Sequence, residues 1–175
     1  MKILYDHQIF ASQKYGGISR YFYELVRELD DVSDVQYEIP LLVSNNHYIS
    51  DKKFVDYIDL LPNKQFRGKY RIFRILNKPN NIWKLKQQKF DVFHPTYYDP
   101  YFLKFFGKKP FVLTVYDMIH EKFSEMFPVT DKTTEQKRLL VEKATKIIAI
   151  SESTKKDLIE IFGTDESKIE VVYLG

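Results

Sequence analysis

Two adjacent glycines, Gly16 and Gly17, stand in the stretch "KYGGISRYFYEL", just before a run of apolar residues with helical spacing. The earlier stretch "KILYD" (2–6) indicates a buried strand, so the pair falls in a strand-to-helix connection. A helix N-terminus exposes unpaired N–H groups and a partial positive charge, and glycine allows a close backbone approach and a positive φ. The pair is therefore either a seat for a phosphate or an acceptor hydroxyl, or only a tight turn.

The spacing around this pair excludes two common nucleotide-binding motifs. The stretch matches neither the G-x-G-x-x-G pattern of dinucleotide-binding proteins nor the G-x-x-x-x-G-K-[ST] pattern of P-loop proteins. Arg20 lies one turn into the expected helix, where it either reaches an anion or is a solvated arginine.

Polar side chains also follow three later strand candidates, "FDVFH" (90–94), "PFVLTVYD" (110–117) and "KIIAIS" (146–151). The carboxyl ends of parallel strands meet at one edge of a sheet, so we expect these side chains to share a rim with Asp6 and His7, which follow the first strand. The candidate rim residues are His94, Tyr97, Tyr116, Asp117, His120 and Ser151.

The elements that must position these residues alternate along the 175-residue chain, whose length suits one domain. Strands separated by helices indicate an α/β fold with a mostly parallel sheet. A break is expected at Lys78-Pro79, an N-cap at Ser151 and a helix stop at Gly163. Strands are predicted at 2–6, 35–44, 54–60, 90–94, 110–117, 146–151 and 168–175, and helices at 18–29, 67–76, 82–89, 133–144 and 152–162.

Composition excludes several classes of site. The chain has no cysteine, which rules out disulfides, cysteine-ligated metals and thiol nucleophiles. The start "MKILYDHQ" lacks the apolar region of a signal peptide, and no apolar run is long enough to span a bilayer. We therefore expect a cytoplasmic protein.

Charge is concentrated in residues 64–89, which contain nine Lys or Arg and no Asp or Glu. Aromatic residues are interleaved with these cations, as in a patch that binds an anionic membrane surface. The alternative is a solvated basic helix whose apolar residues pack on the core. We expect no nucleic-acid partner, because no recognised motif accompanies the charge. The aromatic residues are Phe66, Tyr70, Phe73 and Trp83, and the apolar residues of the alternative are Ile72, Ile75 and Leu76.

Five stretches in this order, "GGISRYFYEL", "DVFHPTY", "VLTVYDMIHEKFSEMFP", "IIAISESTKKDL" and "KIEVVYLG", resemble the N-terminal half of retaining GT-B glycosyltransferases of family 4, the "group 1" enzymes. The resemblance implies that residues 1–175 form a Rossmann-like acceptor-side domain. A second domain that binds the donor nucleotide is then expected after residue 175, and this chain alone is expected to be inactive. No metal ion or cofactor is implied, since the nucleotide-sugar is a substrate, and the chain contains no metal-binding Asp-x-Asp motif.

The resemblance also implies roles for the candidate residues. Gly16 and Gly17 would contact the diphosphate and the transferring sugar of the donor, with Arg20 nearby. Tyr116 stands where the family often has a histidine that contacts the donor sugar, so its hydroxyl would take that place. The acceptor and cleft residues would be His94, Tyr97, Asp117, His120 and Ser151.

The implied activity is transfer of a sugar, with retention of anomeric configuration, to a glycan or lipid-linked acceptor in cell-surface polysaccharide synthesis. Two alternatives remain. One is a single Rossmann-like module that binds a phosphorylated small molecule without catalysis. The other is a protein-interaction domain derived from the enzyme fold, which would not bind a ligand at the glycine pair.

Overall fold

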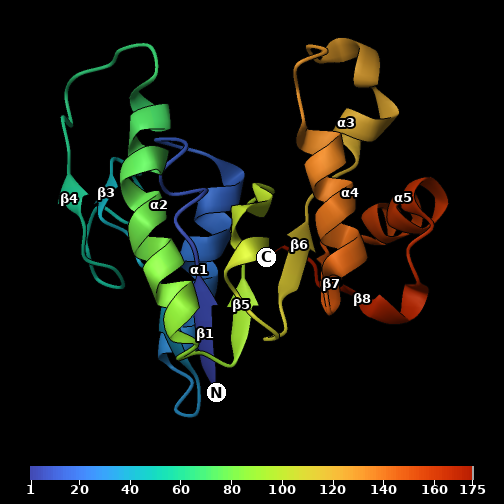
Figure 1. The fold of residues 1–175 in the computed structure, drawn as a ribbon, viewed down its shortest axis with the longest axis horizontal. Coiled ribbons are helices and arrows are strands. Elements are labelled where there is room, and N and C mark those ends of the chain that lie inside the picture. Colours follow the sequence, from blue (N-terminus) through green and yellow to red (C-terminus); the bar gives the residue numbers. More distant parts are fainter. Residues whose placement is uncertain (175) are drawn as a thin grey trace. The chain divides into compact units, whose positions relative to one another are not determined.

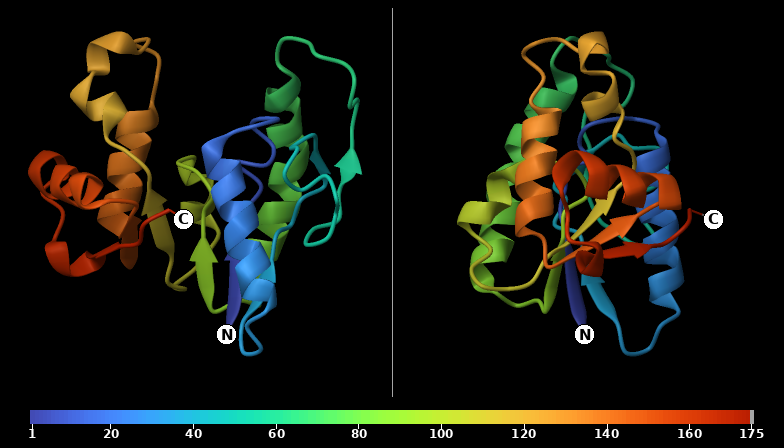
Figure 2. Two further views of the ribbon diagram at one scale, coloured as in Figure 1. Left: turned by 180° about the vertical axis from the view of Figure 1, so that it is seen from behind. Right: turned by 90° about the vertical axis from the view of Figure 1, so that its right-hand side faces the viewer.

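A computed structural model describes residues 1–174, which form two compact units, each containing a parallel β-sheet (Figures 1 and 2). Unit 1 comprises Met1–Tyr97 and Tyr101–Lys109, and unit 2 comprises Tyr98–Pro100 and the residues from Pro110 onward. All described strand pairs are parallel. The predicted α/β class with a mostly parallel arrangement is therefore confirmed.

The main sheet of unit 1 is centred on β1 (Lys2–Tyr5), with β2 (Gln36–Glu38) on one side and β5 (Val92–His94) on the other. The chain thus adds a strand on one side of β1 and then returns to its other side. Right-handed crossovers require the helices of these two connections to cover opposite faces of the sheet. Figures 1 and 2 show this arrangement for α1 (Gly17–Asp30) and α2 (Lys69–Gln87).

Helix α1 forms where the spacing of apolar residues in the sequence predicts a helix. Its predicted range, 18–29, is extended by one residue at each end. Phe22 and Val26 are fully buried, and the ring of Phe22 packs edge-on against Tyr5 of β1 at a centroid distance of 5.8 Å. This contact fixes the helix on the sheet and therefore fixes where its N-terminus lies.

The predicted strand 35–44 is wrong in its middle. The structure splits it into β2 and β3 (Val43–Ser44), and β3 pairs with β4 (Ile58–Asp59) in a separate two-stranded sheet. Pro40 lies in the gap and has no N–H to give to a ladder. Its carbonyl instead accepts a hydrogen bond from the Asn81 side chain of α2 at 2.7 Å.

The predicted break at Lys78-Pro79 is also wrong, because α2 runs through Pro79 without interruption. Two buried asparagines, one on each side of the proline, hold the helix to the rest of unit 1. The Asn77 side chain bonds the carbonyls of Phe73 and Val43, each at 2.8 Å. These side-chain bonds anchor α2 on both sides of Pro79, whose ring nitrogen has no hydrogen to donate to the helix.

The outer face of α2 does not pack on the core, so the core-packing interpretation of residues 64–89 is wrong. Ile72, Ile75 and Leu76 are 44%, 60% and 42% exposed, and Trp83 is 56% exposed. Together with Pro79 they are spaced three or four residues apart and form one exposed stripe. The buried positions of α2 are Lys69, Phe73, Asn77, Asn81 and Leu85.

The sheet of unit 2 has the order β6-β7-β8, with β6 (Val112–Val115), β7 (Lys146–Ala149) and β8 (Ile169–Val171). Its longer helices are α4 (Thr133–Lys143) and α5 (Glu152–Phe162), as predicted. The strand predicted at 168–175 is shorter than expected, and its last residue, Gly175, lies outside the described residues.

The predicted ends of α5 are confirmed. Ser151 accepts a hydrogen bond from the Thr154 N–H through Oγ at 3.1 Å, and Gly163 closes the helix in the left-handed conformation at φ 66°. Sequence periodicity did not reveal the four-residue helix α3 (Ile119–Lys122), which follows β6. Within residues 1–174, no helix is both long and apolar enough to cross a membrane.

Candidate functional site

The carboxyl ends of β1 and β5 carry one group of candidate residues, in unit 1. The direction of strand addition reverses here, since β1 lies between β2 and β5. Such a reversal is where open α/β sheets bind ligands. The rim residues Asp6, His94 and Tyr97 all follow or end these two strands, as predicted.

A buried carboxylate, Asp6, joins the loops that follow these strands. Its Oδ1 accepts hydrogen bonds from the Thr96 hydroxyl at 2.6 Å and from the Thr96 N–H at 3.0 Å. Its Oδ2 accepts bonds from the Gln8 side chain at 2.7 Å and from the Tyr101 hydroxyl at 3.4 Å. Asp6 therefore positions the rim loops through hydrogen bonds from three different segments.

His94 ends β5 and packs inside the unit, where it is 5% exposed. Its ring lies 5.4 Å from Tyr5 and 5.2 Å from Phe22, measured between centroids. Burial lowers the pKa of His94 to about 4, so the imidazole is neutral at pH 7. The neighbouring rim residue Tyr97 is half-buried.

The glycine pair opens α1, and neither glycine lies in the left-handed region that glycine allows. Gly16 is the N-cap residue with an extended backbone, and Gly17 is the first helical residue. A Cβ on Gly16 would lie 2.2 Å from the side-chain nitrogen of Gln13. That amide donates to the Ser19 hydroxyl at 3.3 Å, and Ser19 in turn donates to the Gly16 carbonyl at 3.0 Å. A side chain at position 16 would therefore displace the Gln13 amide from its bond to Ser19.

Gly17 is exposed, and a Cβ placed on it would meet no atom within 4 Å. No side chain caps the helix N-terminus at this point, and the first turn carries no acidic residue. Arg20 is exposed one turn further on and lies 3.9 Å from Glu24. The fold therefore does not require glycine at position 17, and a ligand can approach the first turn of α1.

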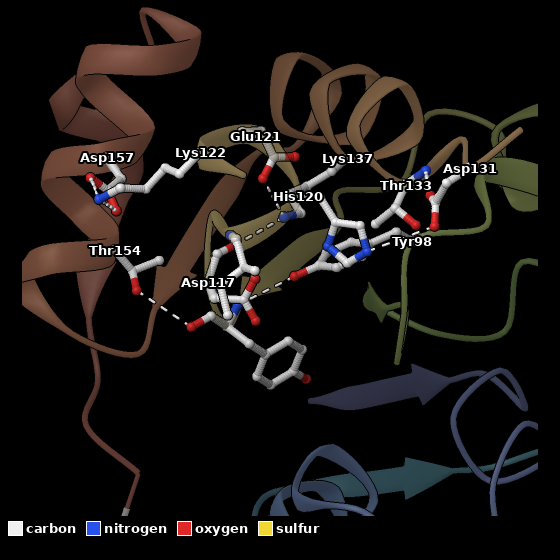
Figure 3. Close-up of polar contacts among 12 residues, drawn as sticks. Tyr98, Asp117, His120, Glu121, Lys122, Asp131, Thr133, Lys137, Thr154 and Asp157 are labelled. Atoms are coloured by element: carbon white, nitrogen blue, oxygen red, sulfur yellow. Dashed lines mark hydrogen bonds and ion pairs between the residues drawn. The ribbon is translucent and has the colours of Figure 1, made fainter. Parts of the chain in front are cut away.

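A separate group of candidate residues lies in unit 2, at the carboxyl end of β6 (Figure 3). Tyr116 is 8% exposed there. Its N–H donates to the Tyr98 hydroxyl at 3.3 Å, and its carbonyl accepts a hydrogen bond from the Thr154 hydroxyl at 3.4 Å. The backbone of Tyr116 is thus tied to α5 and to the segment before β6.

A buried lysine that the sequence reasoning missed holds the loop between β6 and α3. Lys137 of α4 donates to the Asp117 carbonyl at 2.9 Å and to Glu121 Oε2 at 2.8 Å (Figure 3). The side chains of Lys137 and Glu121 are 1% and 2% exposed. In the sequence, only the position of Lys137 indicates that it is buried, because it lies on the same face of α4 as the buried Leu140 and Val141.

Two further rim residues have structural partners on the same loop. The Asp117 carboxylate accepts a hydrogen bond at 3.0 Å from the N–H of Ile119, the first residue of α3. The ring of His120 stacks on Phe127 with 3.9 Å between centroids and lies 3.8 Å from Asp131. The hydrogen bonds from Thr133 lower the pKa of Asp131, so this carboxylate is ionised at neutral pH.

Ser151 serves as the N-cap of α5, as described above, and its Oγ also lies 3.0 Å from the Thr154 hydroxyl. Its candidate role toward a substrate stays a prediction. In the described part of the chain, no three His, Asp or Glu side chains are grouped so that they could hold a metal ion.

A model of the family described as Glycosyltransferase Family 4 matches residues 15–175, which include the glycine pair and the whole rim of unit 2. This chain belongs to glycosyltransferase family 4. The family match begins at Tyr15, directly before Gly16, and extends to the end of the sequence. No curated protein sequence matches the chain.

Solved structures similar to this family 4 chain include HepE from Anabaena in complex with UDP and glucose, with 17% identity and a TM-score of 0.61. The structure of HepE in complex with UDP-glucose has 17% identity to this chain and a TM-score of 0.60. A glycosyltransferase from Rickettsia africae ESF-5 has 21% identity and a TM-score of 0.56. The alignments cover 99–100% of this chain but only 43–45% of those chains. The chain thus spans less than half their length, and the predicted likeness to the N-terminal half of a GT-B glycosyltransferase is confirmed.

Family membership does not by itself assign roles to single residues of this family 4 chain. The structure groups Asp6, His94 and Tyr97 in unit 1, and Tyr116, Asp117, His120 and Ser151 in unit 2. Each group lies at the ends of parallel strands, as predicted. The convergence of both groups on one rim, and the donor and acceptor roles, stay predictions.

Proposed function

We propose that this chain is the acceptor-side part of a retaining glycosyltransferase that needs no metal ion and no cofactor. The protein would transfer a sugar from a nucleotide-sugar to a glycan or lipid-linked acceptor in cell-surface polysaccharide synthesis. The observation that carries this proposal is the family 4 match over residues 15–175. The donor nucleotide would be bound largely by a domain outside these residues, because the chain covers less than half of the similar structures.

The N-terminus of α1 would stabilise the leaving diphosphate of the donor. Negative charge grows on the diphosphate as the glycosidic bond breaks, and preorganised N–H groups facing that charge lower the barrier. The exposed Gly17, with no side chain over the first turn, supports this role, and Arg20 adds a cation one turn away. UDP is our first choice of nucleotide, because HepE structures contain UDP and UDP-glucose.

The acceptor hydroxyl would be held by the rims around His94–Tyr98 and Asp117–Glu121. Holding this hydroxyl beside the donor would by itself raise the rate of sugar transfer, because the two reactants no longer have to meet by diffusion. His94 would not act as a general acid at neutral pH, since burial lowers its pKa to about 4. In the proposed mechanism the leaving phosphate takes the acceptor proton.

A membrane surface is the proposed partner of residues 64–89, and we place the protein in the cytoplasm, at the inner face of the membrane. The exposed stripe of α2 supports this, because Ile75 and Trp83 are 60% and 56% exposed beside the exposed cations Arg71 and Arg74. Such a surface suits an acceptor that is linked to a lipid.

A donor screen with the complete protein tests the proposal. UDP-, GDP- and ADP-linked sugars would be incubated with lipid-linked glycans, and the products analysed by NMR. We expect one donor to give a product whose anomeric configuration equals that of the donor. Inversion would contradict the retaining mechanism. Binding of a phosphorylated sugar without any transfer would favour the alternative, a Rossmann-like module that only binds a phosphorylated small molecule.

A further inference from the structure

Two exposed rings lie beside the start of α1, in unit 1, and we call them the aromatic pair. Tyr15, the residue directly before the N-cap Gly16, is 57% exposed. His47 is also exposed, and its ring lies 5.0 Å from the Tyr15 ring between centroids, with the two planes inclined by 43°. Exposed rings add little to the core, whereas a ligand that packs on them would bury their apolar surface.

Hydrogen bonds hold His47 in this place. It belongs to the loop that follows β3, and its N–H donates to the Lys14 carbonyl at 2.9 Å. The preceding residue, Asn46, is 1% exposed and donates through its side chain to the Gln13 carbonyl at 3.0 Å. The Asn46 N–H donates to the hydroxyl of the fully buried Ser44 at 3.0 Å. The loop after β3 is thus fastened to the loop after β1, so a ligand meets a surface that is already ordered.

The aromatic pair lies within reach of a sugar attached to the proposed phosphate seat. Tyr15 and Gly17 are two positions apart, so their Cα atoms are separated by at most about 7 Å. In a nucleotide-sugar, a single oxygen atom joins the transferring sugar to the diphosphate. A diphosphate at the first turn of α1 can therefore place its sugar against the Tyr15 ring.

The chemistry of this surface suits a sugar that carries a phosphate. The apolar C–H face of a pyranose packs on a flat aromatic ring, while its hydroxyl groups remain in water. The Lys14 ammonium group lies 5.4 Å from the centre of the Tyr15 ring and adds a cation for a nearby phosphate oxygen. A nucleobase also stacks on aromatic rings, but the ribose and both phosphates separate it from the transferring sugar.

We propose that the aromatic pair binds the transferring sugar of the donor, and that this sugar packs on the ring of Tyr15. His47 is a positioning residue, because its ring limits the orientations open to Tyr15. The inference rests on the proposed glycosyltransferase function and adds two specificity-determining residues to the glycine pair. Neither residue is among those to which the family resemblance gives a role.

Calorimetric titration of the complete protein tests this inference. The probes are UDP-glucose, UDP-N-acetylglucosamine and GDP-mannose, together with UDP and GDP. The ratio of the Kd of a nucleoside diphosphate to that of its sugar derivative isolates the contribution of the sugar. The variants are Tyr15→Ala, Tyr15→Phe and His47→Ala, and steady-state kinetics adds the KM values of donor and acceptor. The control is Val32→Ala, at a 45% exposed position just after the opposite end of α1.

We expect the wild type to bind one sugar nucleotide more tightly than the corresponding diphosphate. Tyr15→Ala should weaken binding of that sugar nucleotide by about tenfold and leave the Kd of the diphosphate unchanged, because only the sugar loses its contact. His47→Ala should have the same selectivity and a smaller effect, of roughly threefold. Tyr15→Phe keeps the ring and should match the wild type, as should the control. The KM of the donor should rise in the same order, with an unchanged KM of the acceptor.

A wild type that prefers none of the sugar nucleotides would overturn the inference. Equal weakening of diphosphate and sugar nucleotide by Tyr15→Ala would do the same, since the ring would then contact the base or the phosphates. A change in the acceptor KM alone, or equal losses in Tyr15→Phe and Tyr15→Ala, would also contradict it. Titration does not require turnover, so the expected Kd ratios in a protein that transfers no sugar would refute the proposed function alone.

Discussion

At the scale of single residues, Gly16 and Gly17 are adjacent but have different constraints. Gly16 is enclosed by the side chain of Gln13, whereas Gly17 faces open space. Neither lies in the left-handed region of the backbone that favours glycine. The sequence pattern correctly located both glycines at a helix start. It could not show that their surroundings differ, because the difference depends on the Gln13 side chain, which packs only against Gly16.

Substitution by alanine should therefore change the free energy of unfolding in opposite directions at the two positions. Gly17→Ala should raise the free energy of unfolding by up to about 0.5–1 kcal/mol, because it reduces the entropy of the unfolded chain without a clash. Gly16→Ala should lower it by about 1 kcal/mol, since Gln13 must leave its bond to Ser19. Urea unfolding of the complete protein measures both. A Gly16→Ala variant more stable than Gly17→Ala would contradict this account of the loop.

His94 should make stability depend on pH. Its pKa is about 4 in the folded state and 6.5 as an ordinary histidine, so between these values the unfolded state binds a proton that the folded state does not. The free energy of unfolding should therefore fall as the pH decreases from 6.5 to 4, by about 3 kcal/mol from this residue. The comparison with His94→Gln isolates this contribution, because the other histidines remain. Parallel pH curves for the two proteins would show that His94 is not buried as described.

At the scale of elements, sequence periodicity predicted most strands and helices, including α1, β6, α4 and α5. It failed where long-range hydrogen bonds decide the structure. Pro79 gave a local signal for a helix break, but α2 continues through it, and Asn81 of α2 binds the carbonyl of Pro40, where the predicted strand 35–44 is interrupted. Such contacts join residues 41 positions apart, so no local pattern contains them.

Asn81 should consequently be a stability determinant of unit 1. Its side chain also accepts a hydrogen bond from the His7 N–H at 3.2 Å, next to the rim carboxylate Asp6. Asn81→Ala should lower the free energy of unfolding by about 2–4 kcal/mol, because two buried backbone groups lose this partner. Asn80→Ala, one position away and half-buried, is the matched control and should change stability by less than about 1 kcal/mol. Equal effects in thermal unfolding would argue against the anchoring role.

The outer stripe of α2 should bind anionic membranes. The complete protein should sediment with vesicles that contain phosphatidylglycerol, and less so with pure phosphatidylcholine or at high salt. Ile75→Asp should weaken binding by roughly ten- to 100-fold, because it removes an apolar contact worth about 1.5–3 kcal/mol. Ile58→Asp, at a 65% exposed position on β4, should have no effect. Identical sedimentation of the two variants would remove α2 from membrane binding.

At the scale of the whole molecule, the sequence predicted the α/β class and the likeness to family 4, because both depend on motifs in a fixed order. It also placed the rim residues at strand ends. It did not predict Lys137 and Glu121 as a buried pair, since charged residues are ordinarily assigned to solvent. The sequence thus predicted that the candidate residues lie at strand ends, while the contacts that orient them appear only in the folded chain.

The proposed activity depends on the N-terminus of α1, and the most direct test is the rate of sugar transfer by complete Gly17→Asp and Gly17→Ala variants. The aspartate should leave the fold intact, because position 17 is open and acidic groups favour a helix N-terminus. Its charge should nevertheless repel the diphosphate and lower kcat/KM for the donor by roughly 100-fold, as loss of a charge-stabilising group does. The Gly17→Ala substitution should lower kcat/KM for the donor by less than about tenfold, because it adds no charge. Equal turnover by Gly17→Asp and the wild type would contradict a phosphate seat at this helix.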